Sequence, residues 1–81
     1  MITANTILEY VKARPFRPFR IHMASGDTFD IRHPEMIKVT KWCVVIFTHI
    51  GGEEEIFDHW TTASLMLMES ISHLDVPVAQ A

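Results

Sequence analysis

The sequence has little of what covalent cross-links, metal sites or membrane anchors require. Cys43 is the only cysteine among 81 residues, so an intrachain disulfide or a cysteine-based zinc site is excluded. No apolar run approaches the roughly 20 residues that a membrane-spanning helix needs. The first residues also lack the basic-then-apolar pattern of a secretion signal. We therefore expect a cytoplasmic protein that does not associate with membranes.

The chain also lacks strong charge and any catalytic motif. Its formal net charge is −3 with histidines neutral, which is no strong electrostatic footprint for nucleic acid or an anionic membrane. There is no glycine-rich phosphate loop, carboxylate dyad or nucleophile elbow. The five histidines have none of the spacings of known metal motifs, and they are His22, His33, His49, His59 and His73. We expect no enzyme, no cofactor and no metal.

Apolar residues are what the chain has in surplus. They make up 48% of the sequence, whereas charged residues make up 21%. A chain of this length forms one domain, residues 1–81, and buries only about 60% of its unfolded surface. Two interpretations remain: a second subunit or a partner covers the excess apolar surface, or the core is a dense monomeric one.

The N-terminal residues 3–13 predict a short helix. Thr6 and Glu9 have the spacing of a capping box, with Thr3 or Asn5 as alternative N-caps. A tandem Arg-Pro-Phe repeat follows, and its first proline, Pro15, disfavours helical geometry at the preceding residue. About ten residues cannot hold a helix alone in water, so this helix is expected to pack on a sheet.

From Phe19 the side chains alternate between apolar and polar, which predicts an antiparallel hairpin of residues 19–23 and 29–32. A three-residue loop at 25–27 places Ile21 opposite Ile31 and keeps both apolar faces together. A two-residue loop would invert one face, so the apolar pattern selects the longer loop.

That register has a consequence on the solvent face of the hairpin. It sets His22 opposite Asp30, a pair that is more often a cross-strand contact than a catalytic base with its carboxylate. It also sets Arg20 opposite Arg32. Two like charges opposite each other are unfavourable unless an anion lies between them. The pair of arginines therefore indicates a binding surface.

Residues 42–50 are apolar on both faces and predict a central strand. Gly51-Gly52 is a two-residue hairpin signal that would set Cys43 opposite Trp60 in a return strand ending near Ala63. The next stretch allows two interpretations: a helix containing Leu67, Ile71 and Leu74, or one helical turn followed by a strand at about 68–73. The regular spacing of short strands favours the second, and residues 75–81 are expected to be a frayed tail.

Together these elements predict a mainly β fold, with a short N-terminal helix followed by a β-meander at about 17–74. Five short antiparallel strands with a turn before the last suggest an SH3-like or Sm-like small barrel, and an open meander capped by the helix is the alternative.

Three motifs in the first half resemble a family of small uncharacterised bacterial proteins. They are the segment Pro18-Phe19-Arg20, the Ser25-Gly26 turn followed by an aromatic residue, and His33-Pro34-Glu35. Members usually have Asp-Gly at the turn, whereas this chain has Ser25-Gly26 and so retains the glycine. The resemblance covers about residues 14–74 and implies no activity. The order of elements is also similar to that of Sm-like RNA chaperones, which is an analogy of topology alone.

Two hypotheses of function follow. The first is a non-enzymatic module that acts through protein contacts, as a homo-oligomer or with a protein partner. The second is binding of RNA or single-stranded DNA, since arginines beside aromatic residues suit such ligands. The candidate binding surface consists of Arg14, Arg17, Arg20, Arg32, His33 and Glu35.

Overall fold

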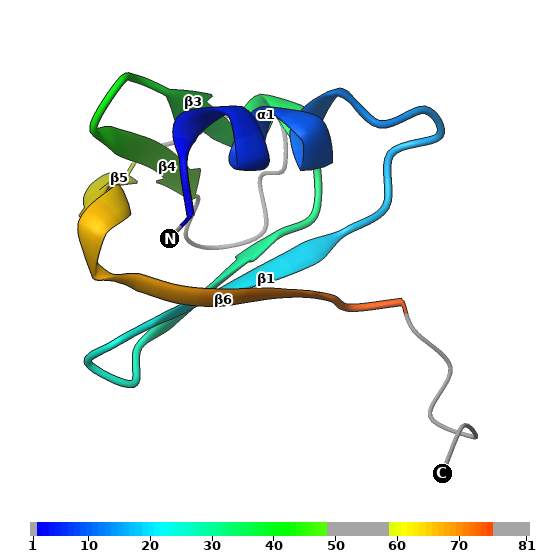
Figure 1. Ribbon diagram of the computed structural model, residues 1–81. Coiled ribbons are helices and arrows are strands. Elements are labelled where there is room, and N and C mark those ends of the chain that lie inside the picture. The colour runs from blue at the N-terminus through cyan, green and yellow to red at the C-terminus, as the bar shows by residue number, and fades with distance from the viewer. Residues whose placement is uncertain (1, 49–58, 76–81) are drawn as a thin grey trace, which may run out of the picture.

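The computed structural model describes residues 2–48 and 59–75, which form one helix and six strands in two small antiparallel sheets (Figure 1). The first sheet has the strand order β2-β1-β6 and the second has the order β3-β4-β5. The elements are α1 (Ala4–Lys12), β1 (Phe19–Met23), β2 (Thr28–Ile31), β3 (Ile37–Val39), β4 (Cys43–Thr48), β5 (His59–Ser64) and β6 (Met68–His73). The 3-10 turns η1 (Pro34–Met36) and η2 (Leu65–Leu67) precede β3 and β6. The predicted mainly β class with an N-terminal helix is confirmed.

The helix begins one turn earlier than the favoured capping box implied. Thr3 is the N-cap, and its hydroxyl accepts a hydrogen bond from the Thr6 backbone N–H at 3.3 Å. The prediction that Thr6 and Glu9 form the box is wrong, and the alternative N-cap is correct. Helix α1 lies against β3 (Figure 1). Its side chain Ile7 is completely buried. A nine-residue helix needs this docking because it is too short to be stable alone.

The first hairpin keeps its predicted faces but not its predicted register. Ile21 lies opposite Phe29 rather than Ile31, and Arg20 lies opposite Asp30 rather than Arg32. The loop is shifted by one residue, because Gly26 has a φ of +99°. This left-handed conformation is strained for other residues, and it belongs at the third position of such a loop. Gly26 therefore fixes the turn, in which its N–H donates to the Met23 carbonyl at 2.9 Å.

The predicted single five-stranded barrel is not what the structure shows. Pro34 has no backbone N–H to donate and begins the turn η1, which separates β2 from β3. The described strands therefore number six, and their pairing does not close into a barrel. The segment His33-Pro34-Glu35 thus forms a turn, and this turn buries Met36.

The second sheet confirms β4 as a central strand, paired with β3 and β5. The predicted register with β5 is wrong by four residues, because Cys43 lies opposite Ser64 and Trp60 lies opposite Phe47. Residues 49–58 connect the two strands, so the predicted Gly51-Gly52 turn lies outside the described residues. The shift is an even number of residues, so each side chain of β4 and β5 stays on the face of the sheet that the predicted register gave it.

The ambiguous stretch after β5 adopts the favoured alternative. Residues Leu65–Leu67 form the turn η2, and Met68–His73 form β6, which pairs with β1. The Ser64 hydroxyl caps the turn by accepting from the Met66 N–H at 3.2 Å. The last strand, β6, therefore lies beside the first strand, β1, in the same sheet. The completely or almost completely buried side chains are Ile7, Phe19, Ile21, Ile31, Val44 and Ile46.

Candidate functional site

The arginines of the first hairpin pair with one carboxylate of the same hairpin. Arg20 Nε lies 2.6 Å from Asp30 Oδ1, and its Nη2 lies 3.1 Å from Asp30 Oδ2. Arg32 Nη2 lies 3.4 Å from the same Oδ2. The expected opposition of Arg20 and Arg32 is therefore wrong, because Asp30 lies opposite Arg20 in the register and binds both arginines. The unfavourable contact that suggested an anion site does not exist.

The other two arginines of the predicted surface also have partners in the chain. Arg17 forms a bidentate ion pair with the Asp75 carboxylate, with an Nη2–Oδ1 distance of 3.1 Å. Arg14 donates to the Ala13 carbonyl at 3.2 Å and to the Lys12 carbonyl at 3.4 Å. All four arginines thus bind groups of this protein, which leaves fewer N–H donors and less uncompensated positive charge for an external anion.

His33 and Glu35 are exposed at the turn η1, on either side of the half-buried Pro34. The backbone of the turn positions these two residues. Pro34 occupies the first position of the turn, and the Met36 N–H donates to the His33 carbonyl at 3.0 Å. The predicted site residues therefore divide into three ion-paired arginines, Arg14 bound to backbone carbonyls, and two residues of the turn η1.

The ion pairs set the protonation of two carboxyl groups. The hydrogen bond from Arg20 is the largest influence that holds the pKa of Asp30 below its ordinary value of 3.8, and the charges of Arg20 and Arg32 add to it. The hydrogen bond from Arg17 lowers the pKa of Asp75 in the same way. Both carboxylates stay ionised at neutral pH.

Replacing Asp30 with asparagine is expected to lower the free energy of unfolding by about 1 kcal/mol at neutral pH, since the pair is partly exposed and screened by solvent. A carboxyl with a lowered folded-state pKa stabilises the fold above its ordinary pKa, and that contribution is lost as pH falls through the folded-state value. The difference between wild type and D30N in urea unfolding should therefore shrink toward zero in acid. A difference that persists at low pH contradicts the ion-pair origin.

The histidines show no convergent site in the described part of the chain. His22 lies opposite Thr28 in β2 and Ser70 in β6, and its Nε2 is 3.0 Å from the Ser72 hydroxyl. The predicted His22–Asp30 pair is therefore wrong. Within residues 2–48 and 59–75, no three His, Cys, Asp or Glu side chains gather closely enough to hold a metal ion.

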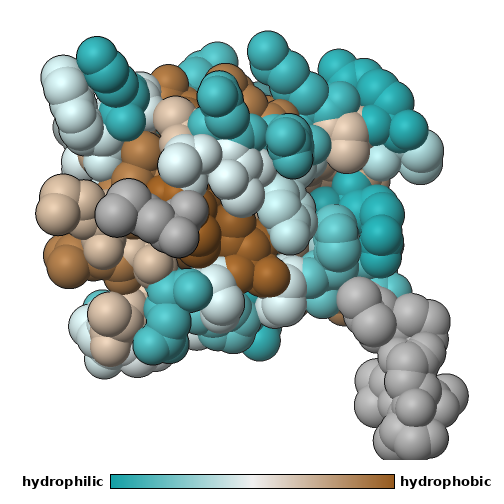
Figure 2. Space-filling view, in the orientation of Figure 1, coloured by the Kyte–Doolittle hydropathy of each residue, from teal (hydrophilic) through white to brown (hydrophobic). Residues whose placement is uncertain are grey.

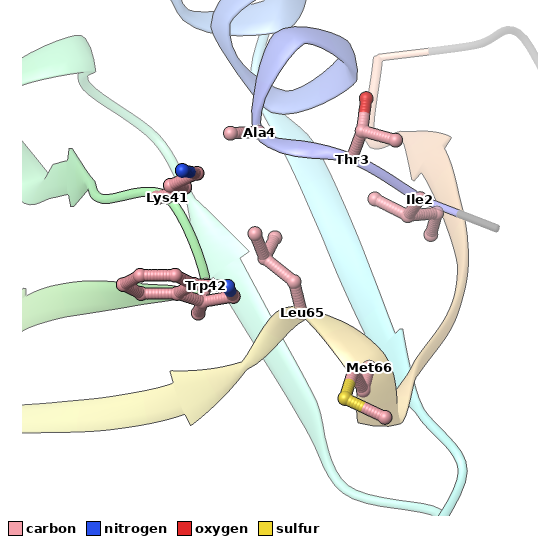
Figure 3. Close-up of a pocket in the computed structure, with 7 residues that line it drawn as sticks. All are labelled: Ile2, Thr3, Ala4, Lys41, Trp42, Leu65 and Met66. Carbon is pink, nitrogen blue, oxygen red and sulfur yellow. The ribbon is translucent and has the colours of Figure 1, made fainter.

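A small apolar pocket lies where η2 meets the start of α1 and the turn between β3 and β4 (Figure 3). Its cavity volume is about 140 Å³, below the roughly 300–1,000 Å³ of typical small-molecule sites. Leu65 lies at its centre, between Trp42 and the start of α1 (Figure 3). The residues around it are Ile2, Thr3, Ala4, Lys41, Trp42, Leu65 and Met66. A pocket of this size accommodates an apolar side chain rather than a metabolite.

Large apolar side chains are exposed around this pocket and on β5. Trp42 is 71% exposed, Trp60 70%, Met66 76% and Leu67 58%. Figure 2 shows apolar surface gathered on the side of η2, while hydrophilic side chains cover the top and the right of the view. The Lys41 ammonium lies 5.2 Å from the Trp42 ring centre, a cation–π contact at the edge of the apolar surface.

The sequence did not mark these residues as a site. Its signal for them was the apolar surplus, which predicts exposed apolar surface without saying where it lies. The site offers a contact surface for apolar groups. Comparison of this chain with protein-family models, with curated proteins and with solved structures found no match. In the described part of the chain, no helix is long and apolar enough to cross a membrane.

Proposed function

We propose that this chain is a non-enzymatic module that acts through protein–protein contacts and self-associates. The observation that carries the proposal is the exposure of Trp42, Trp60, Met66 and Leu67, each by more than half. Single exposed apolar residues are ordinary, but four large ones in an 81-residue chain are costly to leave in water. Tryptophan and methionine are also enriched at the centres of protein interfaces.

The nucleic-acid hypothesis stays a prediction with less support. It depended on free arginines, and the four candidates bind Asp30, Asp75 and two backbone carbonyls instead. The ion pairs with Asp30 and Asp75 already balance part of the positive charge that a phosphate would otherwise meet. The apolar surface, in contrast, can be buried in an interface without weakening an ion pair.

We also propose an SH3-like or Sm-like relationship for the fold, short of a closed barrel. Its support is the order of the final elements, in which β5, the turn η2 and β6 follow one another and β6 returns to β1. A helix precedes the first strand, as in Sm-like proteins. This likeness concerns topology and carries no function by itself.

Light scattering coupled to size exclusion tests the proposed function on the whole chain, after nuclease treatment. We expect a mass above the 9.3 kDa of one chain at micromolar concentration, falling toward it on dilution. Raised salt should leave the mass unchanged, because apolar contacts are not screened whereas exposed ion pairs are. A strict monomer across the whole concentration range would refute self-association.

A further inference from the structure

Strand β5 differs in composition from the other strands that lie at sheet margins. The outer strands of the two sheets are β2, β6, β3 and β5. Three of them carry a charged residue, namely Asp30 in β2, Glu69 in β6 and Lys38 in β3. The six residues of β5, His-Trp-Thr-Thr-Ala-Ser, include no Asp, Glu, Lys, Arg, Pro or Gly. Charges and prolines are what keep edge strands from pairing with other chains, and β5 is the outer strand among the described residues that has neither.

The side chains of β5 also favour pairing. Its first four residues, including Trp60, Thr61 and Thr62, are all exposed. Aromatic and β-branched residues are those most suited to strands. Trp60 lies opposite Phe47 and Thr62 opposite Val45, so one face of the β4–β5 pair is apolar and only partly covered. A strand added beside β5 would extend this face and bury part of it.

We propose that β5 pairs antiparallel with β5 of a second copy of this chain, across a twofold axis. The proposal deepens the proposed self-association and rests on it. The two three-stranded sheets would then join into one six-stranded sheet with the order β3-β4-β5-β5-β4-β3. Backbone hydrogen bonds supply the affinity in such pairings, and the aligned side chains supply the specificity.

The apolar face restricts the register of this pairing. Residues directly opposite in an antiparallel pair lie on the same face, so only registers that pair residues of equal parity keep the two faces continuous. Two central registers satisfy this condition. One sets Thr62 opposite Thr62 of the second copy, and the other sets Thr61 opposite Thr61 and Thr62 opposite Trp60. In both, the two Thr62 residues lie directly or diagonally across the axis.

The chemistry of β5 favours a second copy over a foreign peptide. A twofold pairing brings like residues together, and the absence of charge from β5 means that no like charges meet. A foreign strand selected by charge would require a charged complement on this edge, which the strand does not have. An extended peptide of another protein is therefore an alternative outcome of the test.

A charge exchange at Thr62 tests the pairing in the full chain. Thr62→Lys and Thr62→Glu, each alone, should raise the dimer dissociation constant by at least about tenfold, because like charges then meet across the axis. Mixing the two variants should restore a mass of two chains, since lysine then faces glutamate. The measurement is sedimentation velocity at matched concentrations, with circular dichroism to confirm that each variant is folded.

The matched control is Ser70→Lys, which places the same charge on an exposed position of the other six-residue outer strand, β6. It should leave the dissociation constant unchanged. A wild type that associates while T62K and T62E associate equally well refutes the β5 pairing and leaves the proposed self-association standing. Failure of the mixture to restore the dimer also refutes the β5 pairing. So does the finding that another protein, and not a second copy of this chain, pairs with β5. A monomeric wild type refutes both.

Discussion

Replacing Phe19 with alanine is expected to lower the free energy of unfolding by about 3–5 kcal/mol, the range for removing a fully buried phenylalanine. Phe19 is 0% exposed and lies in the central strand of the first sheet, between Ile31 of β2 and His73 of β6. Its ring lies 5.1 Å from that of Tyr10 and 6.0 Å from that of Phe16, measured between ring centres. The side chain therefore joins both neighbouring strands to the helix and to the Arg-Pro-Phe segment.

The size of this loss matters because the domain is small. At about 0.05–0.15 kcal/mol per residue, 81 residues give a total stability of about 4–12 kcal/mol. Urea unfolding followed by tryptophan fluorescence and circular dichroism measures the change. Phe29→Ala is the matched control, since Phe29 is half-buried on β2 and should cost clearly less. Equal losses for the two variants would contradict the central place of Phe19.

Replacing Ile7 with alanine is the second change with a large expected effect, about 2–5 kcal/mol. Ile7 is the only completely buried residue of α1. Because a nine-residue helix is unstable on its own, the loss should first appear as undocking of α1. Amide hydrogen exchange should therefore speed up in residues 4–12 before it does so in β1 and β4.

The control for this change is the same substitution at the next position. Leu8 is half-buried, so Leu8→Ala alters helix propensity as Ile7→Ala does but removes less buried surface. It should cost clearly less and leave the exchange of α1 almost unchanged. If the two variants exchange alike, burial of Ile7 is not what holds the helix on the sheet.

The identity of the elements could be predicted from the sequence because it depends on local pattern. The alternation from Phe19 gave the first hairpin, Pro15 placed the end of the helix, and the regular strand spacing favoured a turn and a strand over a helix after Ser64. Each of these signals spans a few residues and acts through backbone preferences or through which side chains face the core. The core face of the first hairpin followed from the same alternation.

The candidate site was harder to predict, because its members are close only in the folded chain. Asp30 was available in the sequence as a partner for Arg20, but a register error of two residues concealed the pair. Trp42 comes from the turn between β3 and β4, whereas Leu65 and Met66 come from η2, and these residues meet only where η2 packs against the start of α1 (Figure 3). No spacing in the sequence connects Trp42 with η2.

The sequence by itself determined which face of the first hairpin is apolar, and only the tertiary structure decided in which register each strand pairs with its neighbour. The two predicted registers are wrong by two and by four residues, both even numbers. Side chains alternate with a period of two, so even shifts preserve the faces and the apolar pattern cannot distinguish among them. Gly26 and its left-handed conformation selected the first register. In the second sheet, β5 has the register in which Ala63 lies opposite Val44, and both residues are buried in the core.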